Sequence, residues 1–243
     1  MDVIAVVDPL VSQVSKMHFE QFLSTPFEEL FKHIRQKGRL SSFFVCGDAT
    51  RNIESMCKTA PDSIFVDENV NLADAKTITD KYNIAIGGNI PLTSVMLHGT
   101  QQDNMKYVVD TIDKISNTKN LIIAPGCDMP YAIPVENTIA AAQAVWRTDD
   151  VRKIIDNYTA FEDDITVELP EYDKLEKPLI EVFTLDSETC AACTYMMGAA
   201  NSAKERYGDS IDVVEYKYTV KENIARCKKV GVQHLPSIYI NGE

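Results

Sequence analysis

The chain has no excess of positive charge and no long apolar run. Its 243 residues carry 24 Lys and Arg against 36 Asp and Glu, which gives a formal net charge of −12 at pH 7. A surface of this charge repels nucleic acid and anionic membranes, which are polyanions themselves. No apolar stretch approaches the roughly 20 residues that cross a bilayer, and the start, MDVIAVVDPL, lacks the basic region of a secretory signal. We therefore expect a cytoplasmic globular protein that binds neither nucleic acid nor membrane.

Cysteine is scarce as well. Six cysteines in 243 residues are too few for a disulfide scaffold in a chain of this length. Cys190 and Cys193 have the C-x-x-C spacing, but no second C-x-x-C or pair of histidines accompanies them, as a complete zinc site would require. The other four are Cys46, Cys57, Cys127 and Cys227, the last of which is expected to be a buried core residue.

Residues 1–148 alternate short apolar runs with amphipathic segments, and this alternation predicts an α/β domain. The runs are rich in Val, Ile and Phe and end at Asp, Asn, Gly or Pro, as buried parallel strands do. About five strands are predicted, fewer than the eight of a closed barrel. The expected strands are Val3–Val7, Ser42–Cys46, Ser63–Val66, Ile84–Ile86 and Leu121–Ala124; the expected helices are Phe19–Lys37, Leu72–Asp80, Asn104–Ile115 and Glu136–Ala144; and Gly87-Gly88-Asn89 is expected to be a turn.

A second domain follows an acidic segment. Residues 149–177 lack a clear helical period and are predicted to be a solvated linker, with a short strand at 165–169 as the alternative. Residues 178–243 then form a predicted strand, the C-x-x-C, a helix, a strand, a helix and a last strand preceded by proline. The expected strands are 179–185, 212–218 and 237–240, and the expected helices are 194–208 and 221–231.

Cys190 and Cys193 lie between the first strand and the first helix of this second domain. Unpaired backbone N–H groups and the positive end of the helix dipole favour a thiolate, so the pKa of Cys190 is expected to be lowered. Cys193, one helical turn away, is placed to resolve a mixed disulfide. Leu235-Pro236 directly precedes the last strand and suits a cis peptide bond. The alternatives are a structural or metal-binding cysteine pair and a pair without activity.

These elements, in this order, resemble a thioredoxin or glutaredoxin-like domain over residues 177–243, which end in INGE. The resemblance implies thiol–disulfide redox exchange, with Cys190, Cys193 and Pro236 as the catalytic residues.

Cys46 and Cys127 each follow a predicted strand, in FVCGDAT and APGCDMP. The carboxyl ends of parallel strands lie at one edge of a sheet, so these thiols are expected to converge. Two thiolates are part of a zinc site, and the alternative is a pair of small buried residues.

Several motifs together resemble the uroporphyrinogen decarboxylase superfamily over residues 3–146: DPLVSQVS, FVCGDAT, FVDENVNLADAK, IGGNIP with LHGT, and APGCDMPYAIPVENTIAA. The resemblance implies the last five units of a TIM (β/α)8 barrel. It also implies one of two activities. One is uroporphyrinogen decarboxylation in porphyrin biosynthesis, and the other is zinc-dependent methyl transfer between a corrinoid protein and a thiol.

Cys46 and Cys127 favour the methyltransferase branch, because the resemblance implies both as zinc ligands and implies histidine at position 127 in the decarboxylases. Phe44 stands where the resemblance implies a third ligand, a histidine. Carboxylates at strand ends more often cap helices or face water than bind metal. The carboxylates that remain as substitute ligands are Asp48, Asp67 and Glu68, and the histidines expected on helix surfaces or ends are His18, His33 and His98.

A five-stranded part of a barrel has two unpaired edges and is expected to be unstable alone. We therefore expect either that another chain supplies the missing strands or that the sequence is a piece of a longer protein, and in both cases that the chain is inactive by itself. A corrinoid would come with a partner protein. A third possibility is a non-enzymatic adaptor that binds a corrinoid or tetrapyrrole and uses Cys190 as an electron carrier.

Overall fold

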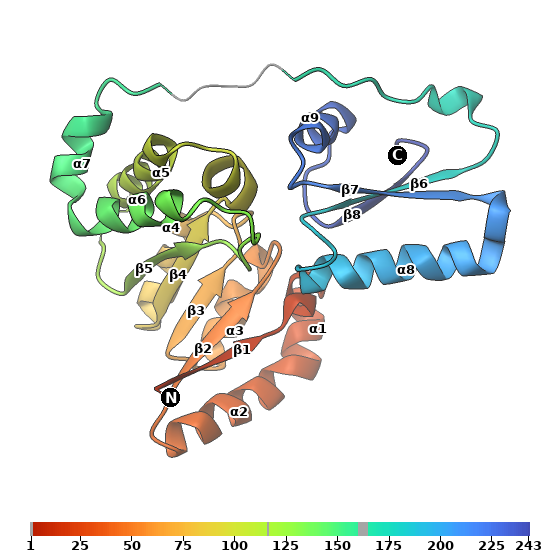
Figure 1. Ribbon diagram of the computed structural model, residues 1–243. Coiled ribbons are helices and arrows are strands. Elements are labelled where there is room, and N and C mark those ends of the chain that lie inside the picture. Colours follow the sequence, from red (N-terminus) through yellow and green to blue (C-terminus); the bar gives the residue numbers. More distant parts are fainter. Residues whose placement is uncertain (1, 116, 160–164) are drawn as a thin grey trace. The chain divides into compact units, whose positions relative to one another are not determined.

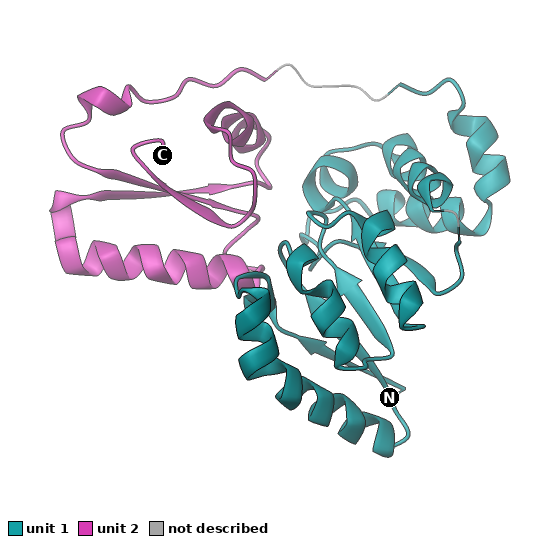
Figure 2. Cartoon of the chain, turned by 180° about the vertical axis from the view of Figure 1, so that it is seen from behind, with its two compact units in different colours: residues 1–160 teal, residues 161–243 magenta. Residues whose placement is uncertain are grey.

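The computed structural model describes residues 2–115, 117–159 and 165–243. The chain divides into two compact units, residues 1–160 (unit 1) and 161–243 (unit 2), which are coloured separately in Figure 2. Among the described residues, none of the helices has the length and apolar character needed to span a bilayer.

Unit 1 is built on a parallel sheet of five strands in sequential order, β1 to β5 (Figure 1). Parallel neighbours need a long crossover between them, and helices provide it. The strands are β1 (Val3–Val7), β2 (Leu40–Val45), β3 (Ser63–Val66), β4 (Ala85–Ile90) and β5 (Leu121–Pro125); the α-helices are α1 (Lys16–His18), α2 (Ser24–Gln36), α3 (Ile53–Lys58), α4 (Leu72–Lys81), α5 (Gln101–Lys114), α6 (Val135–Trp146) and α7 (Thr148–Ile155).

All five predicted strands of unit 1 are present, but the course of β4 and two of the helices differ from the prediction. Gly87-Gly88-Asn89 lies inside β4 and is not a turn. The strand continues because all three residues pair with β5, and Gly87 also pairs with Phe65 of β3, whose ring leaves no room for a Cβ at Gly87. The helix expected at 19–37 is α2 preceded by a π-helical turn at Phe19–Leu23, and α3 was not predicted.

Local sequence and packing explain these helices. Asn71 caps α4 by accepting the backbone N–H groups of Ala73 and Asp74, and Thr100 begins α5 with a capping box. Aromatic rings attach α2 to the sheet. The centroid of the Phe43 ring in β2 lies 4.5 Å from the ring centroid of Phe27 and 5.3 Å from that of Phe31.

Unit 2 contains a three-stranded sheet in the order β7-β6-β8. Strand β6 (Leu179–Thr184) pairs parallel with β7 (Asp212–Lys217) and antiparallel with β8 (Ser237–Ile240). Its helices are α8 (Ala191–Tyr207) and α9 (Lys221–Val230). Each of these elements was predicted, although α8 begins at residue 191 and not at 194.

The segment expected as a linker contains more structure than predicted at its start, because residues 149–155 belong to α7. Part of the segment, residues 160–164, lies outside the described residues. Residues 165–169 are described and form no strand. Their backbone is attached to α9, since Arg226 donates to the carbonyl of Glu168 and Lys229 to that of Val167.

Candidate functional site

Cys46 and Cys127 meet at the carboxyl edge of the unit 1 sheet, as predicted. Cys46 directly follows β2, and Cys127 lies two residues after the end of β5. Their sulfur atoms are joined as a disulfide across 81 residues of sequence, with the two Cα atoms 5.9 Å apart. Neighbouring strands lie about 4.8 Å apart, so three steps across a flat sheet cover about 14 Å. The segments that follow β2 and β5 therefore approach each other over the ends of β3 and β4.

The residues next to these cysteines are attached to the end of β3, which lies between them. Gly47 donates its backbone N–H to Asp67 Oδ2 at 2.9 Å. On the other side, Gly126 packs so closely on Glu68 that an added Cβ would lie 2.8 Å from the Glu68 nitrogen. Gly126 also donates its N–H to the Ile90 carbonyl at 3.0 Å. Both cysteine segments thus make contacts to the ends of β3 and β4 that involve no sulfur atom.

Two carboxylic acids lie at this edge, Asp67 buried and Glu68 partly buried. Burial raises the pKa of Glu68 to about 7, against the opposing effect of the Leu92 N–H, which donates to Glu68 Oε2 at 2.6 Å. Burial also raises the pKa of Asp67. Glu68 can therefore gain or lose a proton near neutral pH, which suits it to general acid–base work.

A buried amide and a phenol support this edge, and sequence reasoning missed both. Asn89 donates to the carbonyls of Asp67 and Val70 at 2.9 and 2.6 Å. The Tyr107 hydroxyl donates to the Asn89 carbonyl at 3.1 Å. The signal available in the sequence was a polar residue, Asn89, in an otherwise apolar strand.

The residues around Cys46 and Cys127 do not fit a zinc ion. Within residues 2–115, 117–159 and 165–243, no group of three or more His, Cys, Asp and Glu side chains is arranged to hold a metal. Phe44 has no ligand atom, and the carboxylate of Asp48 accepts the Thr50 N–H at 3.0 Å in a local turn. The histidines lie where expected, with His18 in α1, His33 in α2 and His98 at the end of the π-helical turn Leu92–Leu97.

The C-x-x-C of unit 2 begins α8. Cys190 is the N-cap residue, and its sulfur accepts the backbone N–H of Cys193 at 3.4 Å. The sulfur of Cys193 accepts the Leu185 N–H at 3.3 Å. Neither cysteine belongs to a disulfide, and both are buried. A hydrogen bond with Cys190 and, next, burial raise the pKa of Cys193 far above its ordinary value, so Cys193 keeps its proton.

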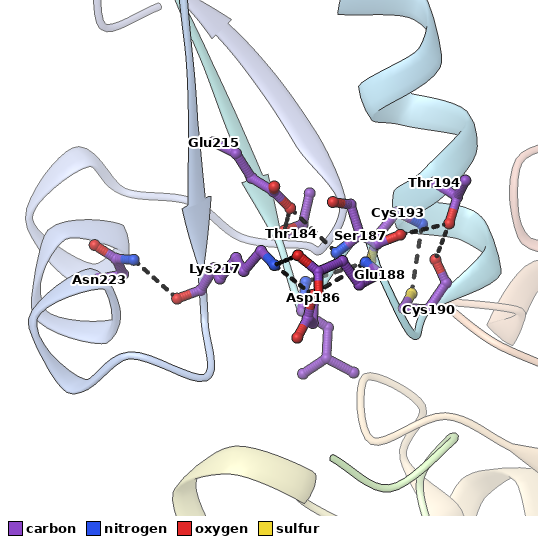
Figure 3. A network of polar contacts seen from close by, with 11 residues as sticks. Thr184, Asp186, Ser187, Glu188, Cys190, Cys193, Thr194, Glu215, Lys217 and Asn223 are labelled. Carbon is purple, nitrogen blue, oxygen red and sulfur yellow. Dashed lines mark hydrogen bonds and ion pairs between the residues drawn. The ribbon is translucent and has the colours of Figure 1, made fainter. Parts of the chain in front are cut away.

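A network of polar contacts fixes the loop that leads into the C-x-x-C (Figure 3). Lys217 of β7 bridges Asp186 and Glu188 at 2.9 and 2.8 Å. Glu215, also of β7, accepts the Ser187 N–H at 3.1 Å. The Asp186 carbonyl in turn accepts the Cys190 N–H at 2.8 Å. Two side chains of β7 therefore set the position of the first cysteine.

The peptide bond between Leu235 and Pro236 is cis, as predicted. Pro236 directly precedes β8, whose first residue, Ser237, pairs with Phe183 of β6. Pro236 therefore lies at the end of β6 from which the chain continues to Cys190.

Known proteins resemble part of this chain. The sequence model of a family described as uroporphyrinogen decarboxylase (URO-D) matches residues 1–147. The chain is 26% identical over 139 residues to the methylcobamide:CoM methyltransferase MtbA of Methanosarcina acetivorans, an alignment that covers 56% of this chain and 39% of that protein. A solved methyltransferase structure from Methanosarcina mazei has a TM-score of 0.53 at 22% identity, and the match covers 59% of this chain and 41% of that one. The chain thus spans about two-fifths of the length of these relatives, and the structural match shows a shared α/β fold with a parallel sheet.

Proposed function

This chain belongs to the uroporphyrinogen decarboxylase (URO-D) family, and from that premise we propose that it acts through thiol chemistry at two separate sites. Unit 2 carries out thiol–disulfide exchange through Cys190 and Cys193. The observation that carries this proposal is the position of Cys190 at the N-cap of α8, where its sulfur accepts the Cys193 N–H. Thiolates at helix N-termini are stabilised by such donors and by the helix dipole.

The exchange proceeds in two balanced steps. Since Cys193 keeps its proton, the Cys190 thiolate attacks a client disulfide, a Cys190–client disulfide forms, and the other client sulfur leaves as a thiolate that takes up a proton. Cys193 then loses its proton and attacks Cys190, which releases the second client thiol. Cys190 and Cys193 end as a disulfide, and the client has gained two electrons. Pro236, at the adjacent end of the sheet, lines the place where the client chain binds.

Reduction of insulin by dithiothreitol tests this function. We expect the full chain to accelerate the reaction and Cys190→Ser to reduce it to the rate without protein. Cys227→Ser is the matched control, because Cys227 is buried in α9 and its pKa is raised to about 12 mainly by burial. An unchanged rate in Cys190→Ser, or no acceleration by the wild-type chain, contradicts the proposal.

A second candidate function for unit 1 is methyl transfer between a corrinoid, brought by a partner protein, and a thiol substrate. It is supported by the similarity to a methylcobamide:CoM methyltransferase and by the convergence of Cys46 and Cys127. The resemblance to this branch implies zinc, but the ligand set described above lacks a third ligand, so no step of this proposal involves a metal.

Incubation of the chain with methylcobalamin and coenzyme M tests the second candidate. Transfer is expected to convert the visible spectrum of methylcobalamin to that of the demethylated corrinoid. An unchanged spectrum rejects the second candidate for this chain. Decarboxylation of uroporphyrinogen by the same sample supports the alternative activity of the family, and binding of either ligand without reaction supports the non-enzymatic adaptor.

We also propose that a further chain pairs with an outer strand of unit 1. β1 and β5 are the outer strands of its sheet, and Val3, Val7 and Ile122 on them are 48%, 51% and 42% exposed. Exposed apolar edge strands favour pairing with other chains. Light scattering should report a self-associated species, and a monomer with one sharp unfolding transition contradicts this expectation.

A further inference from the structure

We propose that Cys46 and Cys127 form a redox-active disulfide, which dithiols reduce and small disulfides restore. This site lies in unit 1 and does not depend on the activity of the C-x-x-C. The disulfide joins two segments that follow non-neighbouring strands, β2 and β5, at the carboxyl edge of the sheet.

Backbone contacts favour re-formation of this bond after reduction. Gly47 is attached to Asp67, and Gly126 is attached to Ile90 and packed on Glu68. None of these contacts involves a sulfur atom, so they remain when the disulfide opens. The two thiols then stay close together, and their effective concentration for each other is high. A disulfide held in this way can cycle without refolding of the unit.

The surroundings of the pair favour sulfur–sulfur chemistry over metal binding. A metal needs a third ligand beside the two thiolates, and the described residues supply none in a suitable arrangement. The other cysteines of unit 1 and of α9 offer a contrast. Cys57 and Cys227 are single buried thiols whose pKa is raised to about 12 mainly by burial, so they are expected to be inert.

Cys127 is the sulfur that a reductant reaches. It lies in the segment between β5 and α6, where the neighbouring side chains of Met129 and Tyr131 are exposed. Cys46, by contrast, directly continues β2. Both cysteines are buried, with Cys46 4% and Cys127 7% exposed, so attack on Cys127 requires a local movement of the residues that follow Gly126.

A dithiol is the electron donor that reduces the disulfide between Cys46 and Cys127. One thiolate of the dithiol attacks Cys127 Sγ, the bond between the two cysteines breaks, and Cys46 leaves as a thiolate that takes up a proton. The second thiolate of the dithiol then attacks the dithiol sulfur that is bonded to Cys127, and this releases the Cys127 thiol. The protein gains two electrons and two protons, and the dithiol becomes a cyclic disulfide.

The oxidation state controls what unit 1 can do, because only thiolates act as nucleophiles or metal ligands. In the disulfide form, neither sulfur is available. Any chemistry of unit 1 that uses either sulfur is therefore confined to the reduced form.

Peptide mapping of the full-length wild-type chain tests the proposal. The chain is equilibrated with mixtures of reduced and oxidised dithiothreitol, its free thiols are alkylated at low pH, and it is digested with trypsin without reduction. Cleavage after Lys and Arg places Cys46 in the peptide 40–51 and Cys127 in the peptide 120–147. We expect these two peptides to be linked in oxidising mixtures and separate in reducing ones, with the same midpoint from both directions.

Two variants serve as controls. Cys57→Ser and Cys190→Ser should both keep the linked peptides. Cys190→Ser also shows that the linkage does not depend on the activity of the C-x-x-C. Three results overturn the proposal: no linked peptides in any mixture, linked peptides that persist in the most reducing mixture, and a stoichiometric zinc ion that is lost in Cys46→Ser. The first two are measured on the wild-type chain, so they do not depend on the folding of a variant.

Discussion

Replacement of Glu68 by glutamine should make unit 1 more stable at alkaline pH. Burial raises the pKa of Glu68 from 4.5 to about 7 in the folded chain. At about 1.36 kcal/mol for each step of one in pKa, this difference corresponds to about 3 kcal/mol. The folded state holds the proton more tightly, so its contribution to stability is fully present below pH 4.5 and is lost as the pH rises through 7. About 2 kcal/mol of this loss falls between pH 5.5 and pH 8.

Urea unfolding at pH 5.5 and pH 8 measures this loss. Trp146 is the single tryptophan and lies in unit 1, so the anisotropy of its fluorescence reports on that unit. In the wild type, part of the decline in the free energy of unfolding between pH 5.5 and pH 8 comes from Glu68. Glu68→Gln should remove that part, because glutamine keeps an acceptor for the Leu92 N–H and has no charge to bury. Glu28→Gln, at an exposed position of α2, is the control for the loss of one negative charge. An equal decline in Glu68→Gln and wild type would refute the reasoning.

Four further changes test other parts of the structure. Lys217→Met should slow insulin reduction roughly two- to tenfold, because the loop before the C-x-x-C loses both ion pairs, while exposed Lys228→Met should leave the rate unchanged. Phe43→Ala should lower the free energy of unfolding of unit 1 by about 3–5 kcal/mol, since the ring is fully buried; a loss below about 1 kcal/mol contradicts the packing described. Gly87→Ala should destabilise unit 1 by about 1–3 kcal/mol through its clash with the neighbouring ring. Gly198→Ala in α8, with open space around it, should stabilise unit 2 by about 0.5–1 kcal/mol in thermal unfolding.

The strands were predictable because each is a short apolar run that is closed by a polar residue, Gly or Pro. The extent of β4 was not, since two consecutive glycines are typical of a turn and only the ring of Phe65 on the neighbouring strand requires Gly87 inside the sheet. Helix α3 was missed because it is six residues long, too short for its periodicity to be apparent. Helix α7 was missed because its charged residues resemble those of a linker.

The candidate site was also predictable from the sequence only in part. The convergence of Cys46 and Cys127 followed from the rule that parallel strands end at one edge. The titration of Glu68 near neutral pH did not, because it depends on how deeply the segment after β5 covers the end of β3. In unit 2, the C-x-x-C and Pro236 were visible in the sequence, whereas the support of the loop by Lys217 and Glu215 requires the parallel pairing of β6 and β7.

The link between Cys46 and Cys127 also determines how the chain responds to mechanical force. In the oxidised form, residues 46–127 are a closed covalent ring, and tension between the two ends of the chain passes through the disulfide and bypasses β3, β4, β5 and helices α3, α4 and α5. Once the bond is reduced, the chain between the cysteines, a sequence separation of 81, also carries the tension and adds about 280 Å of extensible length at about 3.5 Å per residue. A pulling experiment would therefore read the oxidation state of a single molecule as a contour length.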